Sequence, residues 1–139
     1  MSGETVNQMV GQLARGTLDA ARLQGLLATT FKQSNENPYW TYYEFELKNG
    51  PFARGEFRLS KEGGKALLSL MAREEPALTE NDLDLSQWGE VSNIRVSPRI
   101  PPEGTDAYSY NVEGVKVSFQ FTHTSRRLRS VALEWGAVA

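Results

Sequence analysis

The segment that decides the fold is Val115-Lys116-Val117-Ser118-Phe119-Gln120-Phe121, at residues 115–121. Its apolar and polar side chains alternate without exception, and this period of two predicts a strand with one dry and one wet face. Glu113-Gly114 stands directly before it and has the composition of a two-residue hairpin turn. The sequence therefore predicts an antiparallel hairpin over residues 108–123, with four buried side chains: Val115, Val117, Phe119 and Phe121.

Strand patterns extend outward from this hairpin in both directions. Residues 39–48 are rich in aromatic residues, a turn follows at 49–51, and residues 52–60 form the returning strand. Two further strands are predicted at 93–100 and 128–135. Residues 65–73 are apolar without clean alternation, so the pattern leaves both strand and helix open there.

The aromatic strand has two distinct faces. Alternation places Tyr39, Tyr43, Phe45 and Leu47 in the core and puts Trp40 and Tyr42 on the opposite face, beside Glu44 and Glu46. Exposed Trp and Tyr side chains beside carboxylates are typical of binding surfaces. The alternative is that the N-terminal helix or the acidic segment at residues 74–90 covers them.

The chain begins with a helical pattern over residues 5–32, where apolar residues recur at threes and fours. Gly16 interrupts this pattern and favours two helices over one. Together the patterns predict an α+β fold, with an N-terminal helix or helix pair packed on a curved, mainly antiparallel sheet of about six or seven strands. We expect one domain over residues 1–139, with its strand-rich part at 39–135.

Composition narrows the functional classes. The chain has no cysteine, which excludes disulfides, thiolate zinc sites and cysteine nucleophiles. Its formal net charge is −2, and it shows neither a secretory leader nor a long apolar run. We therefore expect a cytoplasmic protein that contacts neither a membrane nor nucleic acid directly.

Residues 74–90 differ from the rest of the chain. They contain six acidic and no basic residues, and Leu83, Leu85 and Trp88 stand among these charges. Two interpretations stay open: an interface for a partner with a basic site, or a crossover loop whose apolar residues pin it to the core. The first interpretation gives the predicted partner-binding residues: Trp40, Tyr42, Glu80, Asp82, Asp84 and Trp88.

No catalytic constellation is recognisable. The single histidine, His123, has only Thr122 and Thr124 as neighbours, and neither is an orienting acid. The chain lacks a serine nucleophile elbow, a phosphate-binding loop and helical metal-ligand spacing. Arg126, Arg127 and Arg129 suit either a phosphate contact or the solubility of a hairpin tip. We expect no enzymatic activity, no metal and no cofactor.

The layout as a whole resembles the small α+β immunity proteins of bacterial toxin–immunity systems. The shared features are a cysteine-free chain of this size, a helical start, the aromatic meander at 39–60, an acidic middle and a closing hairpin that ends at 128–135. The resemblance implies a protein that binds and blocks a cognate toxin from the same cell. The alternative function is a small-ligand carrier with an apolar pocket between helix and sheet.

Overall fold

The computed structural model describes residues 3–16, 18–75, 77–97 and 104–136. Two helices come first, α1 (Gly3–Ala14) and α2 (Ala20–Leu27). Eight strands form one open antiparallel sheet in the order β1-β2-β3-β4-β8-β7-β6-β5. They are β1 (Lys32–Glu36), β2 (Trp40–Glu46), β3 (Phe52–Ser60), β4 (Ala66–Ala72), β5 (Asn93–Ser97), β6 (Thr105–Val112), β7 (Val115–Thr122) and β8 (Leu128–Trp135).

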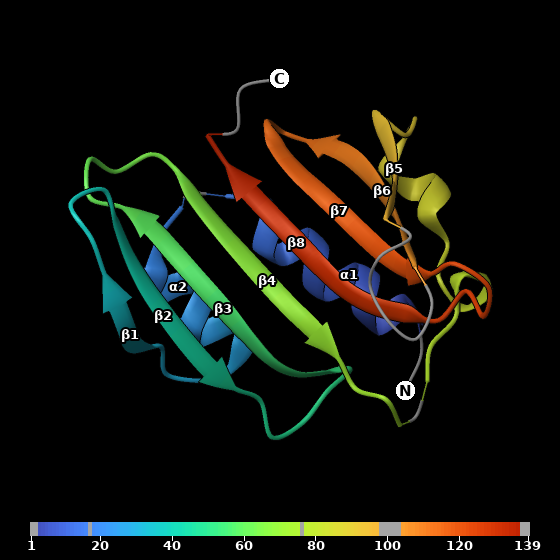
Figure 1. The fold of residues 1–139 in the computed structure, drawn as a ribbon, viewed down its shortest axis with the longest axis horizontal. Coiled ribbons are helices and arrows are strands. Elements are labelled where there is room, and N and C mark those ends of the chain that lie inside the picture. The colour runs from blue at the N-terminus through green and yellow to red at the C-terminus, as the bar shows by residue number, and fades with distance from the viewer. Residues whose placement is uncertain (1–2, 17, 76, 98–103, 137–139) are drawn as a thin grey trace.

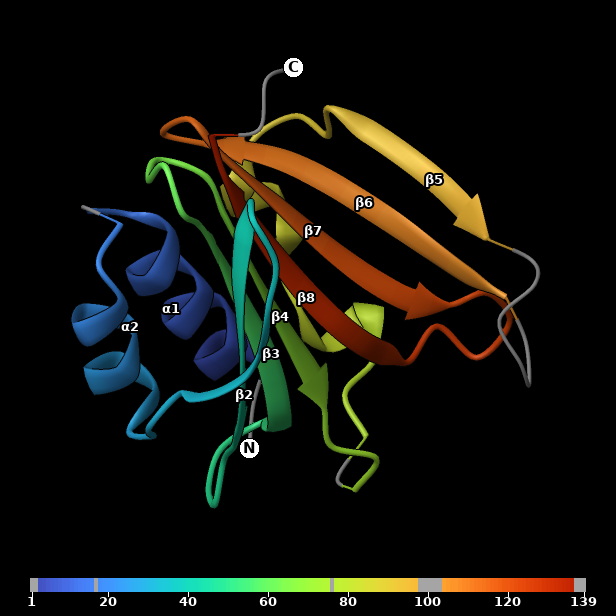
Figure 2. The ribbon, with the colours of Figure 1, turned by 60° about the vertical axis from the view of Figure 1, so that its left-hand side comes forward.

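The sheet has one covered face. Both helices lie behind it in Figure 1 and beside β2, β3 and β4 in Figure 2. The α+β class and the antiparallel pairing are therefore confirmed. No helix among the described residues is both long and apolar enough to cross a membrane.

The predicted hairpin is confirmed. β6 and β7 pair from Thr105↔Thr122 to Val112↔Val115, and Glu113 and Gly114 turn between them with φ of 52° and 86°. Positive φ at both central residues gives the turn the twist of the strands that it joins. Val117, Phe119 and Phe121 are fully buried, and Val115 is 5% exposed.

The break between the helices has a local cause. Gly16 has φ of 99°, a conformation that glycine adopts without steric cost. The Arg22 guanidinium donates hydrogen bonds to the carbonyls of Gln12 and Arg15 at the end of α1. Asp19 caps α2 by accepting from the Ala21 amide at 3.0 Å. Two helices therefore form, as the position of Gly16 in the sequence predicted.

Apolar side chains fill the space between the helices and the sheet. Val10 and Leu13 of α1 and Leu23 of α2 have no exposed surface, and Leu68 and Leu70 on β4 are equally buried. The ring of Phe31 stacks on that of Phe45 with centroids 4.8 Å apart. These side chains form the hydrophobic core between the helices and the sheet.

The crossover between β4 and β5 holds two short 3₁₀ helices, η1 (Glu80–Asp82) and η2 (Leu85–Trp88). It packs on the covered face, because Trp88 is 6% exposed and its ring lies 5.9 Å from that of Phe119. The Trp88 indole N–H donates to Asn7 Oδ1 of α1 at 3.1 Å. Trp88 therefore joins the crossover to the core.

Several predictions need correction. The sheet has eight strands, not six or seven, because β1 is a strand of five exposed residues that show no alternation. The helical stretch ends at Leu27 rather than at residue 32, because Ala28 adopts the left-handed conformation with φ of 53° and caps the helix. Tyr39 is 73% exposed and not in the core, because it precedes β2 in a turn. Residues 65–73, left open above, contain strand β4. Part of the strand predicted at 93–100 lies outside the described residues.

Candidate functional site

The face of β1–β4 that points away from the helices is the largest candidate surface. No described helix or loop lies over it in Figure 1. Because Phe45 and Phe57 enter the core, alternation directs Tyr42, Glu44 and Glu56 to this open face. An uncovered face of an antiparallel sheet is stable in water when its residues are polar.

Trp40 and Tyr42 lie on this open face, as predicted, and both are partly buried. The Arg58 guanidinium lies over the Trp40 ring, 4.7 Å from its centroid. Tyr42 accepts a weak hydrogen bond from Asn37 at 3.4 Å. The Nε of Arg58 is buried and has no hydrogen-bond partner in the described part of the chain. Side chains of the neighbouring strand therefore cover part of these aromatic rings, as Arg58 of β3 covers Trp40. The sequence alone suggested only an exposed surface or a cover formed by a helix or by the acidic segment.

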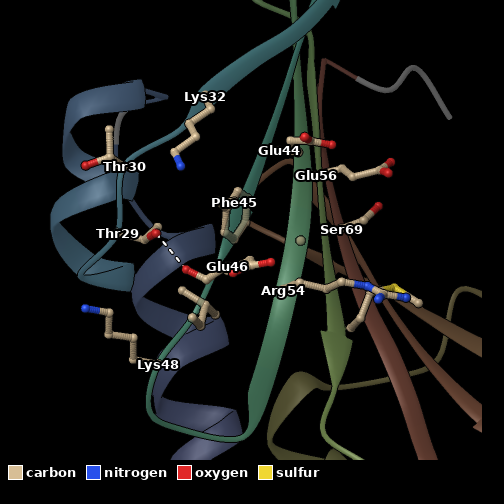
Figure 3. A pocket seen from close by; sticks show the side chains of 13 residues that line it. Thr29, Thr30, Lys32, Glu44, Phe45, Glu46, Lys48, Arg54, Glu56 and Ser69 are labelled. Atoms are coloured by element: carbon tan, nitrogen blue, oxygen red, sulfur yellow. Dashed lines mark hydrogen bonds between the residues drawn. The ribbon is translucent and has the colours of Figure 1, made fainter.

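A groove of about 930 Å³ runs around the edge of β2, next to the start of β1 at Lys32 (Figure 3). We call it the edge groove. Glu44, Glu46, Glu56 and Arg54 line it, together with Ser69 of β4. Glu44 and Glu56 are direct cross-strand neighbours, and like charges in this position destabilise a sheet. This pair therefore lowers stability and concentrates negative charge at one point of the open face.

Two smaller grooves adjoin the edge groove. Tyr42 and Arg58 line the first, the aromatic groove, which shares Glu56 and Ser69 with the edge groove and has about 390 Å³. The second, the arginine groove, has about 360 Å³ and shares Arg54 with the edge groove. Because neighbouring grooves share lining residues, we call the three together the trough, which runs from β1 over β2–β4 to the turn between β7 and β8.

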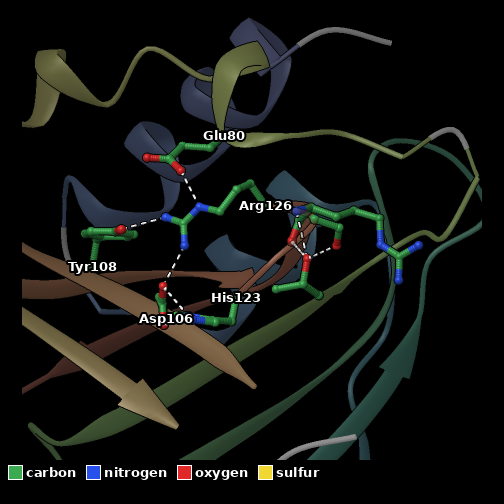
Figure 4. A network of polar contacts seen from close by, with 8 residues as sticks. Glu80, Asp106, Tyr108, His123 and Arg126 are labelled. Atoms are coloured by element: carbon green, nitrogen blue, oxygen red, sulfur yellow. Dashed lines mark hydrogen bonds and ion pairs between the residues drawn. The ribbon is translucent and has the colours of Figure 1, made fainter. Parts of the chain in front are cut away.

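A polar cluster is centred on Arg126 in the turn between β7 and β8, directly beside Arg127 of the arginine groove (Figure 4). Its guanidinium donates to Glu80 at 2.7 Å, to Asp106 at 2.6 Å and to the Tyr108 hydroxyl at 2.5 Å. Arg126 itself has φ of 55°, which is uncommon for a residue with a side chain. We call these groups, with His123, the Arg126 cluster.

The cluster shifts two pKa values. Burial disfavours the charged form of Asp106, but hydrogen bonds from His123 and Arg126 outweigh it and hold the pKa of Asp106 below its ordinary value. The hydrogen bond to Glu80, with those to Asp106 and Tyr108, raises the pKa of Arg126. Both groups are therefore charged at neutral pH.

His123 does have an acid partner. Its Nδ1 lies 3.0 Å from Asp106 Oδ1, across the β6–β7 pair. The prediction considered only the chain neighbours of His123 and was wrong on this point, because residues 17 apart in sequence meet across a hairpin. The side chain is 58% exposed, and His123 lines none of the grooves described above.

The structure does not bring the six predicted partner-binding residues together. Trp40 and Tyr42 are on β2, whereas the acidic segment lies beyond β8 and β7 (Figure 1). Glu80 pairs with Arg126. Asp82 caps η1 by accepting from the Thr79 amide at 2.8 Å, and Asp84 caps η2 by accepting from Ser86 at 3.1 Å. Asp82 and Asp84 are exposed despite these caps.

Sequence reasoning missed the edge groove, the arginine groove and the Arg126 cluster. Each unites residues from several strands, so no local motif marks them. Among the described residues, no group of three or more His, Asp or Glu side chains is placed to hold a metal ion.

Comparisons with known proteins identify no family. No protein-family model, no curated protein and no solved structure matches the chain.

Proposed function

We propose that this chain is a protein-binding inhibitor, of the kind found among small α+β immunity proteins of bacterial toxin–immunity systems. In this proposal it works in the cytoplasm and blocks a toxin by occupying it, without chemistry of its own. The observation that carries the proposal is the trough of three adjoining grooves, which runs from the uncovered face of β1–β4 to the turn between β7 and β8.

The residues of the trough suit a protein partner. Trp, Tyr and Arg are the residue types enriched at interface hot spots. Tyr42 and Arg58 line one end of the trough, and the Trp40 ring lies against the Arg58 guanidinium. Both signs of charge are present, with Glu44 and Glu56 near the middle of the trough and Arg54 beyond them. Four strands at about 4.8 Å spacing make the open face of β1–β4 roughly 14 Å wide, enough for one segment of a partner.

The acidic segment has a different role in this proposal. Asp82 and Asp84 remain exposed, and no basic residue lies in 74–90. Such a segment favours approach of a partner with a basic site, because charge complementarity acts mainly on the rate of association. Trp88, buried in the core, makes no contact with the partner.

Neutralisation can be tested in growing cells. The polypeptide encoded directly upstream is expressed alone and together with this chain, because toxin and immunity genes are expected to be neighbours. We expect growth arrest with the upstream polypeptide alone and normal growth with both. Persistent arrest, or no arrest by the upstream polypeptide, would overturn the proposal.

A matched pair of variants ties the rescue to the trough. Ser69→Arg places a long side chain where the edge and aromatic grooves join, and we expect it to abolish rescue. Leu26→Arg places the same side chain on α2, where Leu26 is 37% exposed, and we expect rescue to persist. Thermal unfolding of both purified variants confirms that each is folded.

A further inference from the structure

The arginine groove gathers positive charge from three strands. Arg54 comes from β3, Arg73 follows β4, and Arg127 and Arg129 belong to the turn before β8 and to β8 itself. Among the described residues, Glu74 is the one carboxylate that lines it. The sequence shows only the 126–129 cluster, whereas the fold adds arginines that are more than fifty residues away in the chain.

Two β-bulges flank this groove. The pairing of β3 with β4 skips Ala53, and the pairing of β7 with β8 skips Arg129. Both skipped residues line the groove. Bulges redirect side chains and are over-represented beside functional sites. Here they lie on either side of β4, at the same end of the sheet.

The Arg126 cluster fixes the turn that carries Arg127. Arg127 forms an isolated antiparallel β-bridge with Thr79. The Arg127 amide donates a hydrogen bond to Thr122 Oγ1 at 2.8 Å. The Glu80 amide donates to the Arg126 carbonyl at 2.9 Å. The Arg126 side chain points into the Arg126 cluster, and the next residue, Arg127, lines the groove. The contacts of the cluster therefore fix the backbone that positions Arg127.

Two of the four arginine side chains in this groove, Arg54 and Arg127, form no hydrogen bond or ion pair within the described residues. Arg73 donates to the carbonyls of Gly50 and Leu47, at 2.9 and 2.6 Å, and holds the β2–β3 turn. By contrast, the donors of Arg54 and Arg127 are free for carboxylate oxygens, which guanidinium groups bind in a bidentate manner.

We propose that the arginine groove binds an acidic segment of the protein partner, with Arg54 and Arg127 as the anion-binding side chains. This inference rests on the proposed function and names the chemistry that the partner presents at this end of the trough. Met71 and Ala72 give the groove an apolar lining, which suits a peptide better than a free inorganic anion. No aromatic side chain lines it, so it lacks the stacking platform of single-stranded nucleic acid sites.

The test uses the purified chain and a fluorescein-labelled hexaglutamate peptide, with fluorescence anisotropy measured at low salt. We expect saturable binding that weakens as salt is added. The double variant Arg54→Gln/Arg127→Gln should bind at least about tenfold more weakly, because each substitution removes a charge-assisted contact. The matched control is Arg95→Gln, an exposed arginine on β5, three strand spacings or roughly 14 Å from β8. It should retain the affinity within about twofold.

Three results would overturn the inference. They are absence of binding, an equal loss in the Arg95→Gln control, and tighter binding of inorganic phosphate or a short oligothymidylate with the same dependence on Arg54 and Arg127. The growth assay separates this inference from the proposed function. If the chain rescues growth but does not bind hexaglutamate, the acidic-segment inference fails alone. If the chain does not rescue growth, the proposed function fails whatever the peptide does.

Discussion

The Arg126 cluster allows a sharp comparison between two neighbouring arginines. Arg126→Ala removes three hydrogen bonds and leaves Asp106, whose side chain is 9% exposed, with His123 as its remaining partner in the cluster. Because Arg126 is 28% exposed and His123 stays beside Asp106, we expect a loss of roughly 1–3 kcal/mol of unfolding free energy, less than for a fully buried charge left unpaired. The Glu80 contact adds little, since that side chain is 38% exposed and such pairs are worth about 0.2–1 kcal/mol.

Arg127→Ala is the matched control. It changes the next residue of the same turn, and the Arg127 side chain has no partner within the described residues. We expect a change of at most about 0.5 kcal/mol, as for most surface substitutions. Urea denaturation followed by tryptophan fluorescence measures both variants. Equal losses, or a loss below about 1 kcal/mol for Arg126→Ala, would refute the assigned role of the cluster.

The acid limb of stability gives a second readout of the same substitution. Because the folded-state pKa of Asp106 is lowered, its contribution is present above its unfolded pKa, near 3.8, and is lost as pH falls through the folded value. Without Arg126, burial raises the pKa of Asp106 relative to wild type. We therefore expect acid unfolding of Arg126→Ala to begin at a higher pH. An acid transition unchanged from wild type would contradict this.

Three further substitutions test the packing. Phe119→Ala, at a side chain with no exposed surface, should cost roughly 3–5 kcal/mol in urea denaturation, and a loss under about 1 kcal/mol would contradict its place in the core. Gly55→Ala brings a methyl group 2.4 Å from the Ser69 carbonyl oxygen, so we expect a loss of about 1–3 kcal/mol, and an unchanged melting temperature would show that the contact relaxes freely. Trp88→Ala should cost roughly 3–5 kcal/mol of unfolding free energy and lower the melting temperature. Loss of rescue with unchanged stability would instead indicate that Trp88 contacts the partner.

Alternation and turn chemistry predicted the strands that face the core. Residues 52–60 and 128–135 were assigned to within a residue, because apolar side chains mark their buried positions. β1 was not predicted because its five residues are polar and exposed. Only its pairing with β2 makes it a strand. Edge strands of this kind carry no periodic signal, so their number cannot be counted from sequence.

The candidate site was predictable only in part. Trp40 and Tyr42 reached the open face because a strand alternates regardless of its partners. Trp88 was also predicted to bind a partner, because it stands among acidic residues in the sequence. Its ring instead packs in the core beside Phe119. The arginine groove depends on strand order, which places β3 and β8 on either side of β4. Local sequence does not specify that order.

Site-directed photocrosslinking in the cells that produce this chain tests the central claim most directly. A photoreactive phenylalanine derivative at Tyr42 places the probe in the aromatic groove, and the same probe at Leu26 places it on α2. We predict one discrete crosslinked protein from position 42 and none from position 26, with the product identified by mass spectrometry as the toxin neutralised in the growth assay. Crosslinking to that toxin from position 26 and not from position 42 would contradict the claim that the open face of β1–β4 is the binding surface.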